Sequence, residues 1–495
     1  MELLYDLESQ ISKTIEQKQS EVAKSTFCIY NVPQNLIETN GNEYYPQVVV
    51  IGPRHIGYGA VYVLENHKLE FLADLFLRKN LGFNELMESI RPLAKKAREC
   101  YSNGMIRDDF FPHYNDDLFL KMMVVDGCFL IELFLKAAEK KGKDPLALIP
   151  RAVPYVYGDL LLLENQIPFF VLEELFTTII NKPDASETSK MPEESNASLS
   201  FLALRLFNKV VRRPDRVIEK FRKRKRATSE DQKPLHLLDL VRSTFIPTHY
   251  PDPPKNNEAC CLIHSISKLR KRERAPSEDQ KPLHLLDLVR STFIPTHDPE
   301  PPKNYNEACR LIHSISKLRR AGIKLKLIKQ ADSFLDVKFS NGVIQMPNII
   351  LDHNMKTFLL NCVAFEYLHN SLSKHFTVYA SFLDCLVDTT LDVGHLCESN
   401  ILDSYFGNYD DVAQFINKMG KDLVFDDDQF YLSDLFKYVS DRYQSPCKVQ
   451  CASFKNRYFN SPWSFISALA ALVLLVLTLL QTFYTIYAYY VKSKP

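Results

Sequence analysis

The sequence predicts a mainly α-helical protein: a helical body with a small antiparallel β-sheet and a C-terminal transmembrane helix. Apolar residues recur at helical spacing through most of the chain, for example in KMMVVDGCFLIELFLKAA. Apolar and polar residues alternate instead at about residues 322–350, a pattern typical of strands. The run at 465–491 is apolar without interruption, which is typical of a membrane span.

The apolar run near the C-terminus contains no Asp, Glu, Lys, Arg or His from Phe465 to Val491. As a helix it would reach roughly 40 Å, enough to cross a hydrocarbon core of about 30 Å. Trp463 lies at one end and four tyrosines lie near the other, where the membrane–water interfaces would be. Membrane lipid is therefore the first expected partner, bound through this helix.

The start of the chain, residues 1–27, is charged throughout and is interpreted as an N-terminal helix. It lacks the apolar centre of a secretory signal. We therefore expect a single-pass membrane protein with a C-terminal anchor and its body in the cytosol, with the plasma membrane as the favoured host. Lysines and arginines flank the span on both sides, so their distribution leaves the opposite orientation open. In that orientation the sequon Asn196-Ala197-Ser198 would become a glycosylation site.

The body covers residues 28–464 and begins with a short strand-like run, VVVI, at residues 48–51. Long helical patterns follow at 61–79, 118–141 and 157–180. Pro168 should divide the last of these into two helical pieces, because proline lacks the amide proton that a helix interior needs. A polar loop is expected at residues 182–199.

The predicted sheet at about residues 322–350 consists of IKLKLI, FLDVKF and VIQMPNII. Ser340-Asn341-Gly342 predicts a tight hairpin turn, because Asn and Gly accept positive φ angles. The strands are therefore expected to pair antiparallel. From Met355 to the membrane span the pattern is helical again.

A duplicated segment occupies residues 229–319. SEDQKPLHLLDLVRSTFIPTH occurs at Ser229 to His249 and again, unchanged, at Ser277 to His297; each copy continues into EAC-x-LIHSISKLR. Two copies are too few for a solenoid, so we expect one copy to fill a place in the core. The second copy is favoured because it runs directly into the predicted sheet. The first copy stays an alternative, since it follows directly from the preceding helical segment.

No catalytic template appears in the chain. It contains no G-x-S-x-G elbow, P-loop, H-E-x-x-H or kinase signature. We therefore expect no catalytic residue, no cofactor and no metal site. Cys447 and Cys451 lack a second pair of ligands nearby, and the odd total of eleven cysteines predicts no disulfide framework.

Three polar residues interrupt apolar or glycine-rich stretches: His55, Asp126 and Glu164. Buried carboxylates cost several kcal/mol unless they are paired and hydrogen-bonded. We therefore expect partners such as Arg54 or Arg98. The favoured interpretation is a structural network, and the alternative is a polar pocket of an unrecognised enzyme.

The run KVVRRPDRVIEKFRKRKR at residues 209–226 is strongly basic, although the net charge of the whole chain is only +1. We interpret it as a solvated helix face. The alternative is attraction to anionic lipid head groups, each charge contributing about 1 kcal/mol near the surface. Nucleic acid is not an expected partner, because nuclear import conflicts with the membrane anchor.

Several strings together resemble one family. They include CIYNVPQNL, YYPQVVVIGPRHIG, KMMVVDGCFLIELF, DLLLLENQIPFFVLEELF, HLLDLVRSTF and YFNSPWSFISALAALVLLVLTLLQT. From about Cys28 to the C-terminus the chain is similar to the plant proteins that carry domain of unknown function 247. This chain departs from that pattern at Arg54-His55-Ile56, where the family usually has a tyrosine and paired histidines, and in its duplicated segment.

The resemblance implies a plant protein with a helical body, a C-terminal membrane helix and no established enzymatic activity. Some relatives are implicated in pollen–stigma self-incompatibility in grasses, which suggests recognition or signalling. We therefore expect a membrane-anchored, non-enzymatic interaction protein with protein partners. The alternatives are an enzyme with a pocket near His55, Asp126 and Glu164, or a peripheral lipid-binding body.

Overall fold

The structure is a computed structural model. It describes residues 27–57, 64–112, 116–138, 153–183, 198–214, 216–220, 233–246, 313–369, 372–421, 423, 431–443 and 462–492. Residues 1–26 of the N-terminal helix expected at 1–27 lie outside these ranges. So do the sequon at Asn196, the Cys447–Cys451 pair and the second copy of the repeated string at 277–297.

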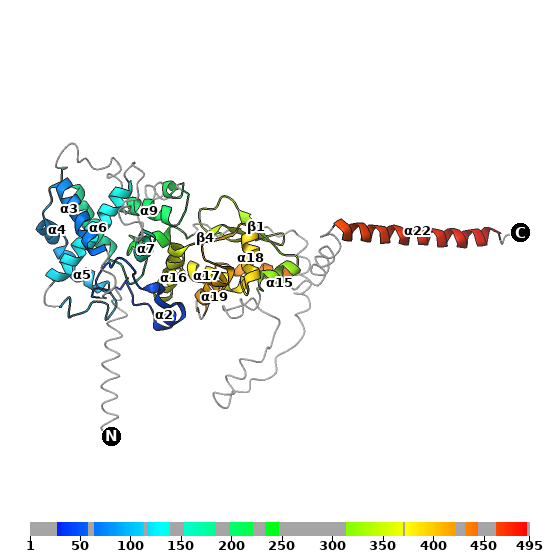
Figure 1. Cartoon of the computed structure of the whole chain (residues 1–495), viewed down its shortest axis with the longest axis horizontal. Coiled ribbons are helices and arrows are strands. Elements are labelled where there is room, and N and C mark those ends of the chain that lie inside the picture. The colour runs from blue at the N-terminus through cyan, green and yellow to red at the C-terminus, as the bar shows by residue number, and fades with distance from the viewer. Residues whose placement is uncertain are drawn as a thin grey trace, which may run out of the picture.

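The described chain is mainly helical, as predicted. Its N-terminal half contains α2 (Gln34–Asn40), η1 (Gly41–Tyr44), α3 (Glu65–Lys79), α4 (Phe83–Ile90), η3 (Arg91–Leu93), α5 (Ala94–Glu99), α6 (Asp117–Ala138), α7 (Val153–Asp159), α8 (Phe169–Ile180) and α9 (Leu199–Val210). The rest of the described chain contains α11 (Leu237–Ser243), α15 (Ile315–Arg320), α16 (His353–Leu368), α17 (His375–Leu386), α18 (Thr390–Glu398), α19 (Tyr409–Gly420), α20 (Ser433–Tyr443) and α22 (Pro462–Lys492). Figure 1 shows α3 to α6 at one end of the body and α17 to α19 at the other.

Two helices form the centres of the hydrophobic core. α6 is apolar nearly all round, and α3, α4, α8 and α9 pack against it. α16 is the second centre, covered by α7, α11 and α17. A helix that is apolar nearly all round, such as α6, is stable only when it is buried. α16 is buried along most of its length as well, although Thr357, Asn361 and Glu366 are among its buried residues.

The small sheet is mixed rather than antiparallel, which corrects the predicted strand arrangement. β3 (Val343–Pro347) lies between β1 (Lys324–Ile328), its parallel neighbour, and β2 (Lys338–Ser340), its antiparallel neighbour. The predicted hairpin turn is present, with φ of 51° at Asn341 and 77° at Gly342. Phe334 and Leu335 of the predicted second strand lie outside β2 and are buried. The connection from β1 crosses to the far side of β3, because β3 lies between β1 and β2.

A second pairing was not anticipated. β4 (Ile349–Leu351) separates from β3 after Pro347 and pairs in parallel with β5 (Leu402–Ser404). The partner strand lies about fifty residues along the chain, and three-residue strands carry too little alternation to be recognised in a sequence.

The segment from Leu160 to Gln166 is not a helix, which corrects another prediction. α7 ends at Asp159, and α8 begins after Pro168 as predicted. Between them, the side chain of Gln166 donates to the carbonyl oxygens of Leu160 and Leu162 at 2.9 and 2.8 Å. Local side-chain bonds to the backbone compete with helical bonds, so this segment folds as successive turns.

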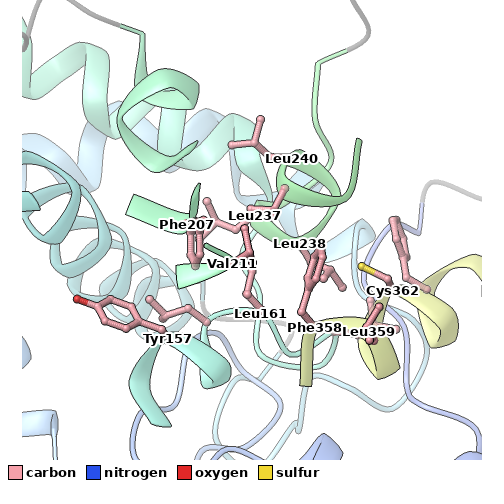
Figure 2. Packing of buried hydrophobic residues seen from close by; sticks show 14 of the residues in the cluster. Tyr157, Leu161, Phe207, Val211, Leu237, Leu238, Leu240, Phe358, Leu359 and Cys362 are labelled. Carbon is pink, nitrogen blue, oxygen red and sulfur yellow. The ribbon is translucent and has the colours of Figure 1, made fainter. Parts of the chain in front are cut away.

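The duplicated segment enters the core in two pieces. The first copy supplies α11, whose leucines Leu237, Leu238 and Leu240 pack beside residues of α9 and α16 (Figure 2). The tail of the second copy supplies α15, which packs against α18. The prediction that one copy alone fills a place in the core is therefore wrong for the described residues, because each copy supplies one helix. Chain continuity explains the result, because α11 follows the segment after α9 and α15 leads directly into β1.

The C-terminal helix α22 stands apart from the body (Figure 1). It contains an apolar span at Leu469–Ile486 with a mean hydropathy of 2.2, and none of that span is buried inside the protein. The structure therefore has a C-terminal helix that is long and apolar enough to cross a membrane.

Candidate functional site

A buried polar cluster surrounds the irregular segment 47–55, and the three polar residues singled out in the sequence all contribute to it. The run VVVI at residues 48–51 is not a strand, which corrects the prediction. Its amide groups bond to side chains from distant parts of the chain instead of to a neighbouring strand. The cluster thereby satisfies backbone donors that would otherwise be buried without partners.

Asp126, near the middle of α6, is the first of these side chains. Its Oδ2 accepts a hydrogen bond from the Gly52 amide at 2.8 Å, and its Oδ1 lies 2.7 Å from the Lys68 Nζ. Lys68 is 2 % exposed and also pairs with Glu65 at 2.8 Å. Burial lowers the pKa of Lys68, but the carboxylates of Asp126 and Glu65 outweigh it and raise the value. The partner of Asp126 is therefore Lys68 rather than the arginines proposed from the sequence.

Asp159 and Asn165 hold the next stretch of the same segment. The carboxylate of Asp159 accepts hydrogen bonds from the amides of Gln47, Val48 and Val49 at 2.7 to 3.1 Å. Burial raises the pKa of Asp159 to about 6, and these amide donors oppose the rise. Asn165 accepts from the Ile51 amide at 2.7 Å. The carboxylate of Asp159, at the end of α7, thus accepts the amide hydrogen bonds that a neighbouring strand would otherwise accept.

Glu164 and His55 meet at the other end of the segment. Glu164 Oε1 accepts a hydrogen bond from the Val32 amide at 2.6 Å, and its Oε2 lies 3.3 Å from His55 Nε2 and 3.5 Å from Arg54 Nε. The prediction that Arg54 pairs with a buried acid is confirmed for Glu164. His55 is 2 % exposed and lies edge-on to the Tyr45 ring at 5.8 Å.

The structure brings His55, Asp126 and Glu164 to one segment, but both carboxylates serve there as hydrogen-bond acceptors for backbone amides. Asp126 and Glu164 each accept from a main-chain amide, and each has a cationic or imidazole neighbour. Buried carboxylates that are hydrogen-bonded to the backbone in this way stabilise one conformation of an irregular segment. This geometry accords with the structural interpretation more than with a catalytic pocket.

A second buried ion pair was missed by sequence reasoning. Arg242 of α11 donates to Glu366 of α16 at 2.7 and 3.0 Å, and it also donates to the carbonyl oxygen of Ser373. The other carboxylate oxygen accepts from the amide and hydroxyl of Thr377 at 2.8 and 2.9 Å. The two charged side chains are 2 % and 0 % exposed. The repeated string HLLDLVRS contains Arg242, but Glu366 lies 124 residues away in the sequence, so the string alone does not reveal the pair.

A cavity of about 430 Å³ lies away from both clusters, where α19 approaches η1 and α16. Its lining includes Glu43, Lys356, Phe406 and Phe415. Lys356 pairs with Glu43 at 2.7 Å, and its Nζ lies 5.8 and 5.6 Å from the two ring centroids. Within the described ranges, no group of three His, Cys, Asp or Glu side chains is arranged to hold a metal ion.

The described part of the basic segment 209–226 bonds within the body. Arg213 donates to the carbonyl oxygen of Asp332 at 2.7 and 3.0 Å, and its guanidinium lies 3.8 Å from the Phe245 ring centroid. Burial lowers the pKa of Arg213 to about 10. Arg216 and Lys220 both pair with the Asp332 carboxylate. These contacts attach the basic segment to the connection between β1 and β2.

The sequence of this chain is similar to plant proteins. The family model described as "Plant protein of unknown function" (DUF247) matches residues 29–273 and 257–477, and the two matches overlap in the duplicated segment. "UPF0481 protein At3g47200" of Arabidopsis thaliana is 31% identical over 455 residues, covering 90% of this chain and 83% of the relative. "Putative UPF0481 protein At3g02645" of the same plant is 24% identical over 505 residues, covering 93% of this chain and 90% of the relative. No solved structure shows significant similarity to this chain. On this evidence, the chain belongs to the DUF247 family of plant proteins of unknown function.

Proposed function

We propose that this protein is a non-enzymatic interaction protein, anchored in a membrane by α22 and carrying its body in the cytosol. The plasma membrane is the favoured host. The observation that supports the proposal is the apolar surface of α22.

The surface of α22 suits lipid better than water. From Leu469 to Ile486 no part of the span is buried in the protein, and its leucines, valines and isoleucine are 47 to 65% exposed. The hydroxyls of Thr478, Thr482 and Thr485 each donate to the carbonyl four residues earlier at 2.8 Å. Polar groups satisfied within the helix are compatible with the hydrocarbon region, where no water is available.

The body supports a role in binding more than in catalysis. Its buried carboxylates bond to backbone amides or to buried cations, as described above for Asp126, Asp159 and Glu366. A single span confines such a body to one surface and raises its effective concentration for partners on the same membrane. The expected partners are membrane proteins.

The membrane anchor is tested by alkaline carbonate extraction of the full chain. The double variant Leu474→Arg/Leu477→Arg places two charges near the middle of the span, each costing about 3 kcal/mol there. The matched control is Leu69→Arg/Leu77→Arg, which changes two leucines of α3 that are 56% and 77% exposed. Wild type and control should stay in the pellet and the α22 variant should be released. Release of wild type would contradict the anchor.

The orientation and the partner need separate experiments. Protease treatment of sealed vesicles should digest an N-terminal tag if the body faces the cytosol; protection would reverse the proposed orientation. For the partner, the full chain is compared with a chain whose α22 is replaced by an unrelated span, both recovered from native plant membranes. A protein that copurifies with both chains binds the body, and recovery of no specific protein would contradict the interaction role.

A further inference from the structure

Two cysteines that are distant in the sequence lie side by side at the edge of the core. The amides of Cys28 and Ile29 both donate to the Cys100 carbonyl oxygen, at 2.9 and 3.0 Å. The Ser102 amide returns a hydrogen bond to Ile29 at 2.9 Å, and Ile29 pairs with Tyr101 in a parallel bridge. This backbone pairing joins the start of the described chain to the residue after α5.

The side chains of the two cysteines meet as well. Cys28 and Cys100 are 4% and 6% exposed, and their thiols form a hydrogen bond with each other. The Cys100 Sγ also lies 3.3 Å from the Lys96 carbonyl oxygen. The hydrogen bond of 2.9 Å from the Cys28 amide to the Cys100 carbonyl oxygen keeps the two α-carbons within about 7 Å of each other, close to the separation that a disulfide can bridge.

The two thiols differ in acidity. The hydrogen bond from the Cys28 thiol lowers the pKa of Cys100, although burial of Cys100 opposes this effect. The same hydrogen bond, together with burial, raises the pKa of Cys28. Cys100 is therefore the more acidic thiol of the pair, and the thiolate is the form that attacks a disulfide.

We propose that Cys28 and Cys100 form an oxidisable dithiol that closes to a disulfide through exchange with a low-molecular-weight disulfide such as glutathione disulfide. In the first step the Cys100 sulfur attacks one sulfur of glutathione disulfide and expels one glutathione thiolate. In the second step Cys28 attacks the Cys100 sulfur, and its proton passes to the departing glutathione sulfur, so that the second glutathione leaves as a thiol. Two protein thiols are oxidised to one disulfide, and one glutathione disulfide is reduced to two glutathione molecules.

The bond would lock the N-terminal segment beside the buried polar cluster. Val32, four residues after Cys28, donates its amide to Glu164 at 2.6 Å, so the segment that the disulfide fixes also contributes to that cluster. Disulfides persist in oxidising compartments and are rare in the cytosol. The redox state of this pair would therefore differ with the side of the membrane on which the body lies. The chemistry itself does not depend on the proposed function.

The test uses the full chain in detergent micelles, equilibrated in glutathione buffers of increasing oxidised fraction. Free thiols are then alkylated, and peptides are analysed by mass spectrometry without reduction. We expect a peptide that joins Cys28 to Cys100, with both thiols lost over one transition. The melting temperature should rise on oxidation, because the cross-link restricts the unfolded chain.

Variants distinguish the pair from general oxidation. Cys28→Ser should leave Cys100 as a mixed disulfide with glutathione, because the resolving thiol is missing. Cys128→Ser is the matched control; Cys128 is completely buried in α6, and its replacement should leave the transition unchanged. Circular dichroism confirms that each variant is folded. The proposal is overturned if folded wild type yields no joined peptide at the most oxidising ratio, or if Cys28 and Cys100 react independently.

Discussion

The ion pair between Arg242 and Glu366 offers a sharp test of how the duplicated segment is used. Arg242 belongs to the first copy, and the second copy carries an identical arginine, Arg290, outside the described residues. In the structure Arg242 fills the place beside Glu366. Replacement of Arg242 by alanine should therefore destabilise the protein, and the same replacement of Arg290 should not.

The expected loss of stability follows from the groups that lose a hydrogen-bond partner when Arg242 is removed. Without it, Glu366 keeps its bonds to Thr377 on one oxygen, but its other oxygen loses both guanidinium bonds, and the Ser373 carbonyl loses a donor. Removing one partner of a buried pair costs about 3–5 kcal/mol. A typical total stability is about 5–15 kcal/mol, so Arg242→Ala should lower the unfolding midpoint markedly. Adding Glu366→Gln should recover part of this loss, because the unpaired buried charge is removed.

The assay is urea unfolding of the full chain in detergent, followed by circular dichroism. Arg290→Ala should change the free energy of unfolding by less than about 0.5 kcal/mol. Equal losses in the two single variants would refute the assignment of the first copy to this place. So would a loss that appears only when both arginines are replaced, since the second copy would then be substituting for the first.

Three further predictions use the same measurement. Deletion of residues 250–297 removes one 48-residue unit and joins the head of the first copy to the tail of the second; cooperative unfolding should persist, and its loss would show that the removed unit is needed. Burial raises the pKa of Glu132 to about 7, so stability from this group is complete below its unfolded value near 4.5 and is lost as the pH rises through 7. The change is about 3 kcal/mol, and Glu132→Gln should flatten that part of the pH profile; an unchanged slope would argue against it. Gly52 has φ +76°, and a Cβ there would lie 2.5 Å from the Gln166 carbonyl oxygen, so Gly52→Ala should cost at least about 2 kcal/mol. Gly82, where a Cβ meets nothing within 4 Å, is the control, and Gly82→Ala should cost under about 1 kcal/mol.

Much of the fold was predictable because its signals are local. The helical spacing at 61–79 and 118–141 became α3 and α6, and Pro168 marks the start of α8 as expected. The Asn341-Gly342 turn has the positive φ angles that these residues favour. Each of these features depends on neighbours within a few residues, so one sequence contains enough information to locate it.

The candidate site was only partly predictable. The sequence singled out His55, Asp126 and Glu164 because polar groups in apolar or glycine-rich stretches need partners, and Arg54 was correctly named beside an acid. It missed Lys68. In the sequence, this charged residue is typical of a surface position on a helix, and only the structure shows that it faces Asp126. Lys68 and Asp126 are 58 residues apart in the chain, and no spacing rule connects them.

Taken alone, the amino-acid sequence was enough to establish a helical body and an apolar C-terminal helix, because hydrophobic periodicity and length act through nearest neighbours. Tertiary structure alone decided that residues 48–51 bond to side chains instead of a strand, that β3 separates β1 from β2, and that the core takes α11 from one copy and α15 from the other. It also decided that Cys28 lies beside Cys100. The physical reason is that the partners of buried donors, acceptors and thiols are distant in the sequence and meet only when the chain folds. No local sequence pattern identifies which distant residues will become neighbours.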